Sequence, residues 1–375
     1  MGAGQRPILK WAVNLSALLL VVLLTIPTLG LLVSSFRDRD QIAQSGWWQA
    51  FTASERSDFV RTGTDDDAEQ IDGIYVIEGN VLSEGQTLSG WGTSARRPDE
   101  FKPGDTTQIE DGWDLTVAED GAYRLTSPAP FEMRRGERIF VTVTTPPRLT
   151  TENYGRVLRA EGLGRAFMNT LTVTIPATII PILVAAFAAY ALAWMRFPGR
   201  ALLTATLVGL LVVPLQVALI PLLRLHNELG IGKGYLGIWL AHTGFGLPLA
   251  IYLLRNYMAG LPHEIIESAR VDGATDFQIF RRIVLPLSFP ALASFAIFQF
   301  LWVWNDLLVA TVFLGNTREQ LVMTGLLREQ MGSKGGEWEI LATSAFISIA
   351  VPLLVFFAMQ KYLVRGLLAG SVKGG

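Results

Sequence analysis

Six long apolar runs constrain this chain more than any other feature, because each is long enough to cross a lipid bilayer. A membrane-spanning helix needs about 20 consecutive apolar residues. Half of the 375 residues are hydrophobic and only 17% are charged, a composition typical of membrane proteins. The first run lacks an A-x-A cleavage site and is longer than a signal-peptide core, so we expect an uncleaved anchor. The six expected spans are residues 12–35, 167–194, 201–223, 236–254, 289–313 and 340–360.

The basic residues predict which side of the membrane each short loop occupies, since cytosolic loops are enriched in Lys and Arg. With the N-terminus inside, eleven basic residues fall in the cytosol and five outside, leaving out the large insert described below. Both termini and the polar stretch 255–288 are therefore expected in the cytosol. The cytosolic set is Arg6, Lys10, Arg196, Arg200, Arg255, Arg270, Arg281, Arg282, Lys361, Arg365 and Lys373, and the external set is Arg224, Lys233, Arg318, Arg328 and Lys334.

An acidic block separates the first two expected spans. Residues 37–165 carry 23 acidic and 15 basic residues, whereas the rest of the chain is net basic. Short segments of alternating polarity between Gly, Asp and Pro turns predict strands in this block. The run at 65–67 is three aspartates without the spacing of a calcium loop, so we expect it to be solvated. The expected strands are residues 74–77, 113–117, 123–126 and 138–144.

The expected fold class is therefore an all-α polytopic membrane protein with six transmembrane helices. A β-rich extracytoplasmic insert lies between helices 1 and 2. The predicted division is a cytosolic N-terminus and first helix (1–36), the extracytoplasmic insert (37–165) and a five-helix core (166–375) that contains the cytosolic loop 255–288.

The polar stretch in that cytosolic loop has the local signals of a helix–turn–helix elbow. Pro262 suits a helix start, and Gly273 can adopt the left-handed conformation that ends a helix. Thr275 and Gln278 have the spacing of a capping box. Pro286 is expected to end or kink the second helix. An apolar stripe at helical spacing is expected on that helix, formed by Phe277, Phe280, Ile283 and Val284.

The elbow also carries a sequence motif, E-[S/A]-A-x3-G-x9-I-x-L-P. It resembles the EAA loop of ABC-importer permeases, in the carbohydrate branch of maltose-type inner permeases and, within it, the α-glucoside permeases. The resemblance covers residues 153–375 well, the first span weakly and residues 37–152 hardly at all. The long insert departs from most maltose-type members but is shared by α-glucoside members. The motif residues are Glu267, Ser268, Ala269, Asp272, Gly273, Ala274, Ile283, Leu285 and Pro286.

The resemblance implies a non-catalytic permease subunit in a bacterial inner membrane, taking up a carbohydrate such as an α-glucoside. Its expected partners are two copies of an ATPase subunit, a second permease, an extracytoplasmic sugar-binding protein and membrane lipid. ATP and Mg²⁺ are expected on the ATPase subunits. The motif residues would dock on the ATPase, with Glu267 contacting a basic residue there, Gly273 setting the turn, and Ile283, Leu285 and Pro286 holding the second helix to the fifth span.

Polar residues inside the spans are costly and are therefore candidate pathway or interface positions. Two other interpretations stay open. Trp and Asp at the end of a span can anchor it at the membrane interface, and a Gln can pair with a neighbouring helix. The candidates are Gln216, Gln299, Trp302, Asn305 and Asp306.

Several kinds of chemistry lack support in the sequence. There is no G-x4-G-K-[S/T] phosphate loop, no cysteine, and the three histidines are far apart. We therefore expect no catalytic residue, cofactor or metal in this chain, and no dense basic–aromatic patch suggests nucleic acid. Two alternative functions remain: an ion-coupled secondary carrier, which gives no reason for the elbow, and a membrane receptor whose insert binds a ligand.

Overall fold

The computed structural model describes residues 7–109, 112–159, 162–315, 317–333 and 336–369. Arg6, Lys334 and Lys373, which entered the prediction of topology, lie outside the described residues, as does the side chain of Arg365. The chain divides into two compact units, residues 1–151 and 152–375. The predicted domain limits at residues 36 and 165 stay predictions.

The first unit begins with the apolar helix α1 (Pro7–Ser35), followed by α2 (Arg39–Gln44) and the 3₁₀ turn η1 (Trp47–Gln49). The two ends of the insert meet where the Thr150 amide donates to the Phe36 carbonyl at 2.6 Å. Beside this junction the buried Arg37 guanidinium donates to the carbonyls of Gln41 and Ser45, at 2.7 and 2.8 Å. Burial lowers the pKa of Arg37 below its ordinary value, and Asp38 opposes this shift. The junction is thus a closed, hydrogen-bonded base for the insert.

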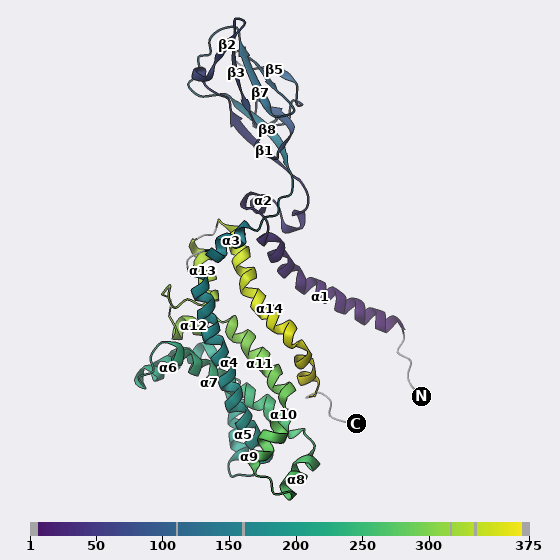
Figure 1. Cartoon of the computed structure of the whole chain (residues 1–375), viewed down its shortest axis with the longest axis vertical. Helices are drawn as coiled ribbons and strands as arrows, with labels where there is room; N and C mark the ends of the chain where they lie inside the picture. Colours follow the sequence, from purple (N-terminus) through teal and green to yellow (C-terminus); the bar gives the residue numbers. More distant parts are fainter. Residues whose placement is uncertain (1–6, 110–111, 160–161, 316, 334–335, 370–375) are drawn as a thin grey trace. The chain divides into compact units, whose positions relative to one another are not determined.

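Two antiparallel sheets form the rest of the insert (Figure 1). One has the order β1-β8-β4 and the other β2-β3-β7-β6-β5. Side chains from both sheets, including the fully buried Trp91, Leu125 and Val141, share one apolar core. The strands are β1 (Ser54–Arg61), β2 (Glu69–Ile71), β3 (Ile74–Asn80), β4 (Thr87–Gly92), β5 (Thr106–Gln108), β6 (Asp114–Val117), β7 (Ala122–Ser127) and β8 (Arg138–Thr145), with the turn η2 (Asp65–Asp67) before β2.

The predicted β-rich insert is therefore present, and all four predicted strands lie within or overlap β3, β6, β7 and β8. The sequence did not predict β1, β2, β4 and β5. In β1 nearly every side chain is exposed on both faces, so the strand lacks the alternation of polarity that reveals a half-buried strand.

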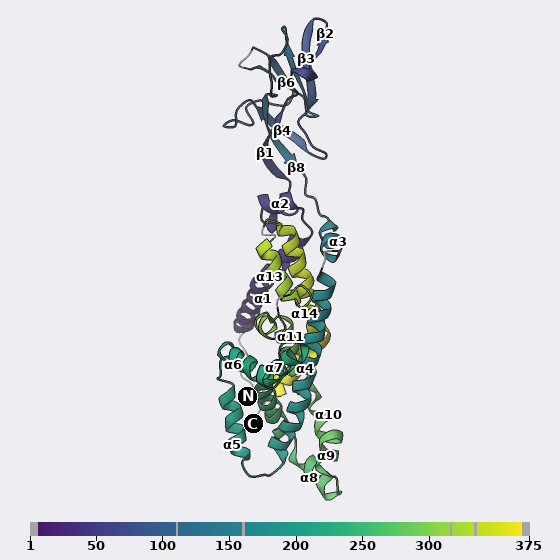
Figure 2. The ribbon, with the colours of Figure 1, turned by 90° about the vertical axis from the view of Figure 1, so that its left-hand side faces the viewer.

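The second unit is helical, and its long helices α4 (Leu163–Trp194), α11 (Phe289–Trp304) and α14 (Trp338–Ala369) run side by side (Figures 1 and 2). Figure 2 shows α5 and α6 along one side of this unit, opposite α8, α9 and α10. The elements are α3 (Glu152–Arg159), α4 (Leu163–Trp194), α5 (Arg200–Leu210), α6 (Leu215–Glu228), α7 (Tyr235–Ala259), α8 (His263–Val271), α9 (Asp276–Ile279), the π-helical turn η3 (Phe280–Val284), α10 (Leu285–Leu287), α11 (Phe289–Trp304), α12 (Leu308–Phe313), α13 (Met323–Ser333) and α14 (Trp338–Ala369).

The predicted spans correspond to helices, but two of them are not single straight helices. Among the described residues, four helices are long and apolar enough to cross a membrane: α1, α4, α7 and α14. The number rises to six only if each of two bent helix pairs counts as one span. The expected third span is α5 and α6, which meet at 111°. Pro214 lies at this break as the first residue before α6, and it cannot donate the backbone bond that would continue α5.

The expected fifth span is also interrupted. Its main helix α11 ends at Trp304, and α12 begins only at Leu308. Before α11, the segment Asp276–Leu287 meets it at 69°. The bend lies at Ser288, between Pro286 and Pro290, so it comes just after the predicted position at Pro286. Pro290 supplies the reason, because its ring lacks the N–H that would bond to the Pro286 carbonyl one turn back.

Candidate functional site

The elbow has the turn geometry that the sequence predicts. Gly273 adopts the left-handed conformation, with φ of +78°, directly after α8. Thr275 caps α9: its amide donates to Gln278 Oε1 at 2.8 Å, and its hydroxyl accepts from the Gln278 amide at 3.3 Å. Pro262 lies one residue earlier than expected, before the first residue of α8 rather than in its first turn. The capping box and the glycine turn are confirmed.

A π-helical turn follows α9. The Leu285 amide donates to the Phe280 carbonyl, five residues back instead of four. This wider turn rotates the apolar face of the helix relative to a regular α-helix. The predicted stripe is therefore wrong at Phe277, which is 59% exposed, while Ile279 is fully buried. Phe280 and Val284 are buried as expected.

The buried face of the elbow packs on the ends of three long helices. Ile266, Ile279 and Phe280 share one apolar cluster with residues of α4, α7 and α11. The Phe280 ring lies 4.7 Å from the ring of Phe187 and 5.3 Å from the ring of Tyr190, both in α4. A displacement of the elbow would therefore be transmitted to all three helices through close-packed side chains.

A polar contact at the C-terminal end of α4 fixes the same elbow. The Tyr190 hydroxyl donates to Asp276 Oδ1 at 3.0 Å. Arg270 Nη2 donates to the Trp194 carbonyl at 3.1 Å and lies 3.4 Å from the same Asp276 oxygen. No motif or spacing in the sequence selected Tyr190 or Trp194. Their only signal is that aromatic residues with polar atoms gather near the ends of membrane spans.

The opposite face of the elbow is exposed in the described part of the chain. Glu267, Ser268, Asp272 and Gly273 are exposed, and no described basic group lies within salt-bridge distance of Glu267. Val271 and Phe277 add apolar surface, at 88% and 59% exposure. The remaining predicted docking residues divide between the two faces: Ala269, Ala274, Ile283 and Leu285 are half-buried, and Pro286 is exposed.

The predicted pathway residues do not form one cluster. Gln216 is exposed on α6. Gln299 is buried between helices: its Nε2 donates to the Ala177 carbonyl of α4 at 3.1 Å, and a side-chain carbon at Gly246 of α7 would lie 2.8 Å from its Oε1. This arrangement matches the alternative interpretation of a helix-pairing glutamine, while a role of either residue in a pathway stays a prediction.

Asp306 occupies the break between α11 and α12. Its carboxylate accepts from the Ala310 amide at 3.1 Å and so caps α12. The ring of the fully buried His242 lies 5.6 Å from the Trp302 ring, and its Nε2 is 3.8 Å from Asp306 Oδ2. Asn305 bonds back to the Leu301 carbonyl. Trp304, the last residue of α11, is buried, and its Nε1 donates to the Ser348 carbonyl of α14 at 3.0 Å.

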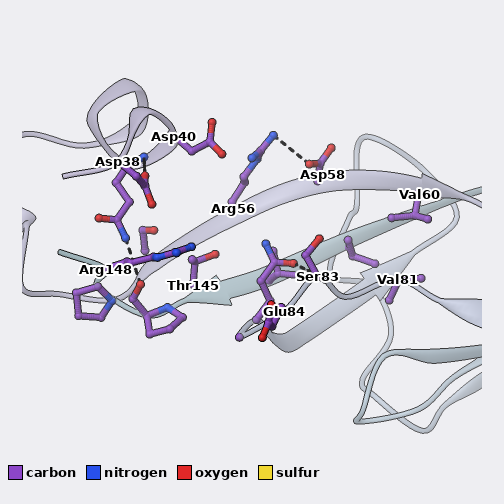
Figure 3. Close-up of a pocket in the computed structure, with 18 residues that line it drawn as sticks. Asp38, Asp40, Arg56, Asp58, Val60, Val81, Ser83, Glu84, Thr145 and Arg148 are labelled. Atoms are coloured by element: carbon purple, nitrogen blue, oxygen red, sulfur yellow. Dashed lines mark hydrogen bonds and ion pairs between the residues drawn. The ribbon is translucent and has the colours of Figure 1, made fainter. Parts of the chain in front are cut away.

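A separate groove lies on the insert, over the face formed by β1 and β8 (Figure 3). Its volume is about 640 Å³. Val60, Val81, Val141 and Val143 provide apolar lining, and charged side chains of both signs line the rest. Arg56 Nη2 lies 3.0 Å from Asp58 Oδ2, so this pair of charges is neutralised. None of the lining residues is aromatic. Among the described residues, no three His, Asp or Glu side chains gather as a metal site requires.

Comparisons with known proteins decide the family. The family described as "Binding-protein-dependent transport system inner membrane component" matches residues 160–368. The chain belongs to this family. The predicted resemblance to ABC-importer permeases is thereby confirmed, and the matched region holds both the elbow and the break at Asp306.

Relatives extend the match beyond the helical unit. The alpha-glucoside transport system permease protein AglG of Rhizobium meliloti (strain 1021) is 63% identical over 380 residues, covering 100% of both chains. The osmoprotective compounds uptake permease protein GgtD of Synechocystis sp. is 60% identical over 221 residues, covering 59% of this chain and 74% of that protein. The insert is thus part of what the chain shares with AglG.

A solved structure supports the permease fold. It is the crystal structure of a bacterial ABC transporter involved in the import of the acidic polysaccharide alginate. One of its chains aligns with a TM-score of 0.51 and 24% sequence identity, covering 58% of this chain and 81% of that chain. At this identity the likeness concerns the fold alone.

Proposed function

We propose that the chain is the permease subunit of an ATP-driven importer for an oligosaccharide of the α-glucoside class. The observation that carries this proposal is the 63% identity to an α-glucoside permease over the full length of both chains, insert included. The elbow supports the ATP-driven mechanism, because it presents an exposed face while its other face packs on α4, α7 and α11.

The mechanism that follows is mechanical. A separate ATPase subunit binds the exposed face, with Glu267 making a charge-assisted contact to a basic residue of that subunit. Val271 and Phe277 supply the apolar part of the contact. When the ATPase subunits close on ATP and Mg²⁺, the elbow moves and carries the ends of the three helices with it. The chain itself contributes no catalytic group in this scheme.

The assembly that this mechanism requires contains two ATPase copies, a second permease and an extracytoplasmic sugar-binding protein. Both termini of the chain lie in the cytosol of a bacterial inner membrane, so that the elbow faces the ATPase subunits. This orientation is supported by the excess of basic residues in the short loops assigned to the cytosol.

The proposal is tested by purifying the tagged chain from its own host membranes, as wild type and as Glu267→Arg. We expect wild type to bring an ATPase and a second permease, and vesicles of that complex to take up a radiolabelled α-glucoside such as maltose with ATP. Glu267→Arg should retain the second permease but lose most of the ATPase. Gly273→Asp should lower ATPase recovery in the same direction but by less, because aspartate adopts the left-handed conformation less readily than glycine but more readily than most side chains.

Glu69→Arg, at an exposed position of β2, is the matched control and should behave as wild type. Full ATPase recovery and uptake in both elbow variants would reject the docking site. Uptake by the purified chain without ATP would instead favour an ion-coupled carrier, and maltose binding without transport would favour a receptor.

A further inference from the structure

An aromatic group lies at the base of the insert, outside every site described so far. It consists of Trp47, Trp48 and Phe51, which we call the stem patch. Trp48 and Phe51 are each 70% exposed. The chain has no charged residue between Asp40 and Glu55, although the insert is rich in charge on both sides of this segment. A solvated loop would not need such a stretch, whereas a segment that contacts an apolar phase would.

The backbone turns so that the stem patch lies beside α1 rather than beyond its end. The buried Arg37 ties the carbonyls of Gln41 and Ser45 together just after the helix. The Trp47 indole then rests on Gly30, where an added side-chain carbon would lie 2.9 Å from Trp47 Nε1. Only a residue without a side chain allows this close approach. The indole is thereby fixed about 7.5 Å back along the helix from its last residue, Ser35, at 1.5 Å per residue.

The depth of Gly30 along α1 matches a membrane boundary. Trp11, which follows Lys10 and is 74% exposed, marks the other end of the apolar part of the helix. From Trp11 to Gly30 the helix rises about 28 Å, close to the roughly 30 Å of a bilayer's hydrocarbon core. The side chains between them are largely exposed Leu and Val. Aromatic residues therefore stand at both ends of a bilayer-sized apolar segment, as the two aromatic belts of a membrane protein do.

We propose that the stem patch inserts into the interfacial region of the bilayer on the side of the insert. Trp48 and Phe51 contact acyl chains near the headgroups, and Trp47 joins them to α1. The occupant is lipid because the patch is continuous with the exposed apolar surface of α1, carries no charge, and lies at the level where hydrocarbon ends. The base of the insert thus contacts the membrane and is not a solvated linker. This inference rests on the proposed function in one respect only, namely that the insert lies on the external side of the membrane.

The experiment uses the full chain, which lacks cysteine, so that a single introduced cysteine carries the only label. Trp48→Cys and Phe51→Cys are labelled with a bimane fluorophore and reconstituted into phosphatidylcholine nanodiscs. A fraction of the lipid carries a nitroxide at acyl carbon 5 or at acyl carbon 16. Asp66→Cys, at an exposed position of η2 outside the stem patch, is the control.

We expect nitroxide at carbon 5 to quench both stem labels at least about twofold more than nitroxide at carbon 16, as interfacial depth requires, and to leave the Asp66→Cys label nearly unchanged. Quenching no stronger than at Asp66→Cys would overturn the proposal. A blue-shifted but unquenched stem label would also overturn it, because protein and not lipid would then cover the patch.

Gly30→Leu tests the geometry from the helix side. The leucine occupies the position of the Trp47 indole and should displace the stem, so that quenching of the Trp48→Cys label by carbon 5 falls at least about twofold. Unchanged quenching would show that the contact of Trp47 with Gly30 does not set the depth. None of these measurements needs an ATPase or transport, so their failure is distinguishable from failure of the proposed function.

Discussion

At the scale of single residues, the elbow depends on a few hydrogen bonds that connect it to α4. Tyr190 is buried and donates to Asp276, while Asp276 is about half exposed and can also be solvated. The tyrosine ring separately contacts Phe280. One side chain therefore contributes both a polar and an apolar contact, and the two can be separated by substitution.

Tyr190→Phe should remove only the polar contact. Hydrogen bonds to charged groups contribute about 1.5–3 kcal/mol. We expect a loss of about 1.5 kcal/mol, the lower limit of that range, because water can replace the hydroxyl at Asp276. The measurement is the thermal unfolding midpoint of the chain in nanodiscs, with proteolysis of the elbow as a local readout. Tyr190→Ala should cost about 3–5 kcal/mol, in the range for large aromatic side chains. Equal effects of the two variants would contradict this separation.

At the scale of secondary-structure elements, the elbow shows what a sequence can and cannot predict. The capping box and the glycine turn were predictable because their signals are local and lie within a few residues. The position of Phe277 was not, since it depends on the π-helical turn that follows α9, and no residue in Phe280–Val284 marks such a turn. The break between α5 and α6 was missed for a similar reason: the run 201–223 contains no charged residue, and Pro214 alone does not distinguish a kink from an end.

The capping box allows a prediction for α9, which has only four residues. Thr275→Ala removes the side chain that accepts from the Gln278 amide and should cost about 1 kcal/mol, as loss of an N-cap does. Because α9 is so short, that loss should appear as faster hydrogen exchange at the amides of residues 276–279. Thr275→Ser keeps the hydroxyl and should exchange at the wild-type rate. If Thr275→Ala also exchanges at that rate, the cap does not stabilise α9.

At the scale of the whole molecule, the sequence predicted the class of each part better than its internal packing. Membrane helices, a β-rich insert and an elbow follow from apolar runs, strand alternation and the motif at Glu267. The hydrogen bond between Tyr190 and Asp276 could not be predicted, because the two residues are 86 positions apart in the sequence. They come into contact only when the elbow packs against α4. The stem patch was missed because its meaning depends on Gly30, which belongs to a different helix.

The two units have separate apolar cores, and this predicts that the insert can lose its structure without loss of the elbow. Trp91 is fully buried between the sheets, and its Nε1 donates to the Lys102 carbonyl at 3.0 Å. Trp91→Ala should destabilise the insert by about 3–5 kcal/mol and expose its β-strands to hydrogen exchange. Hydrogen exchange in α8 and α9 should stay at the wild-type rate, and recovery of the ATPase in the purification described above should equal that of wild type.

Trp338→Ala, at an exposed position in α14, controls for loss of a tryptophan and should leave hydrogen exchange in the insert unchanged. Loss of ATPase recovery in Trp91→Ala would show instead that the core of the insert supports the elbow, so that the two units fold as one cooperative structure.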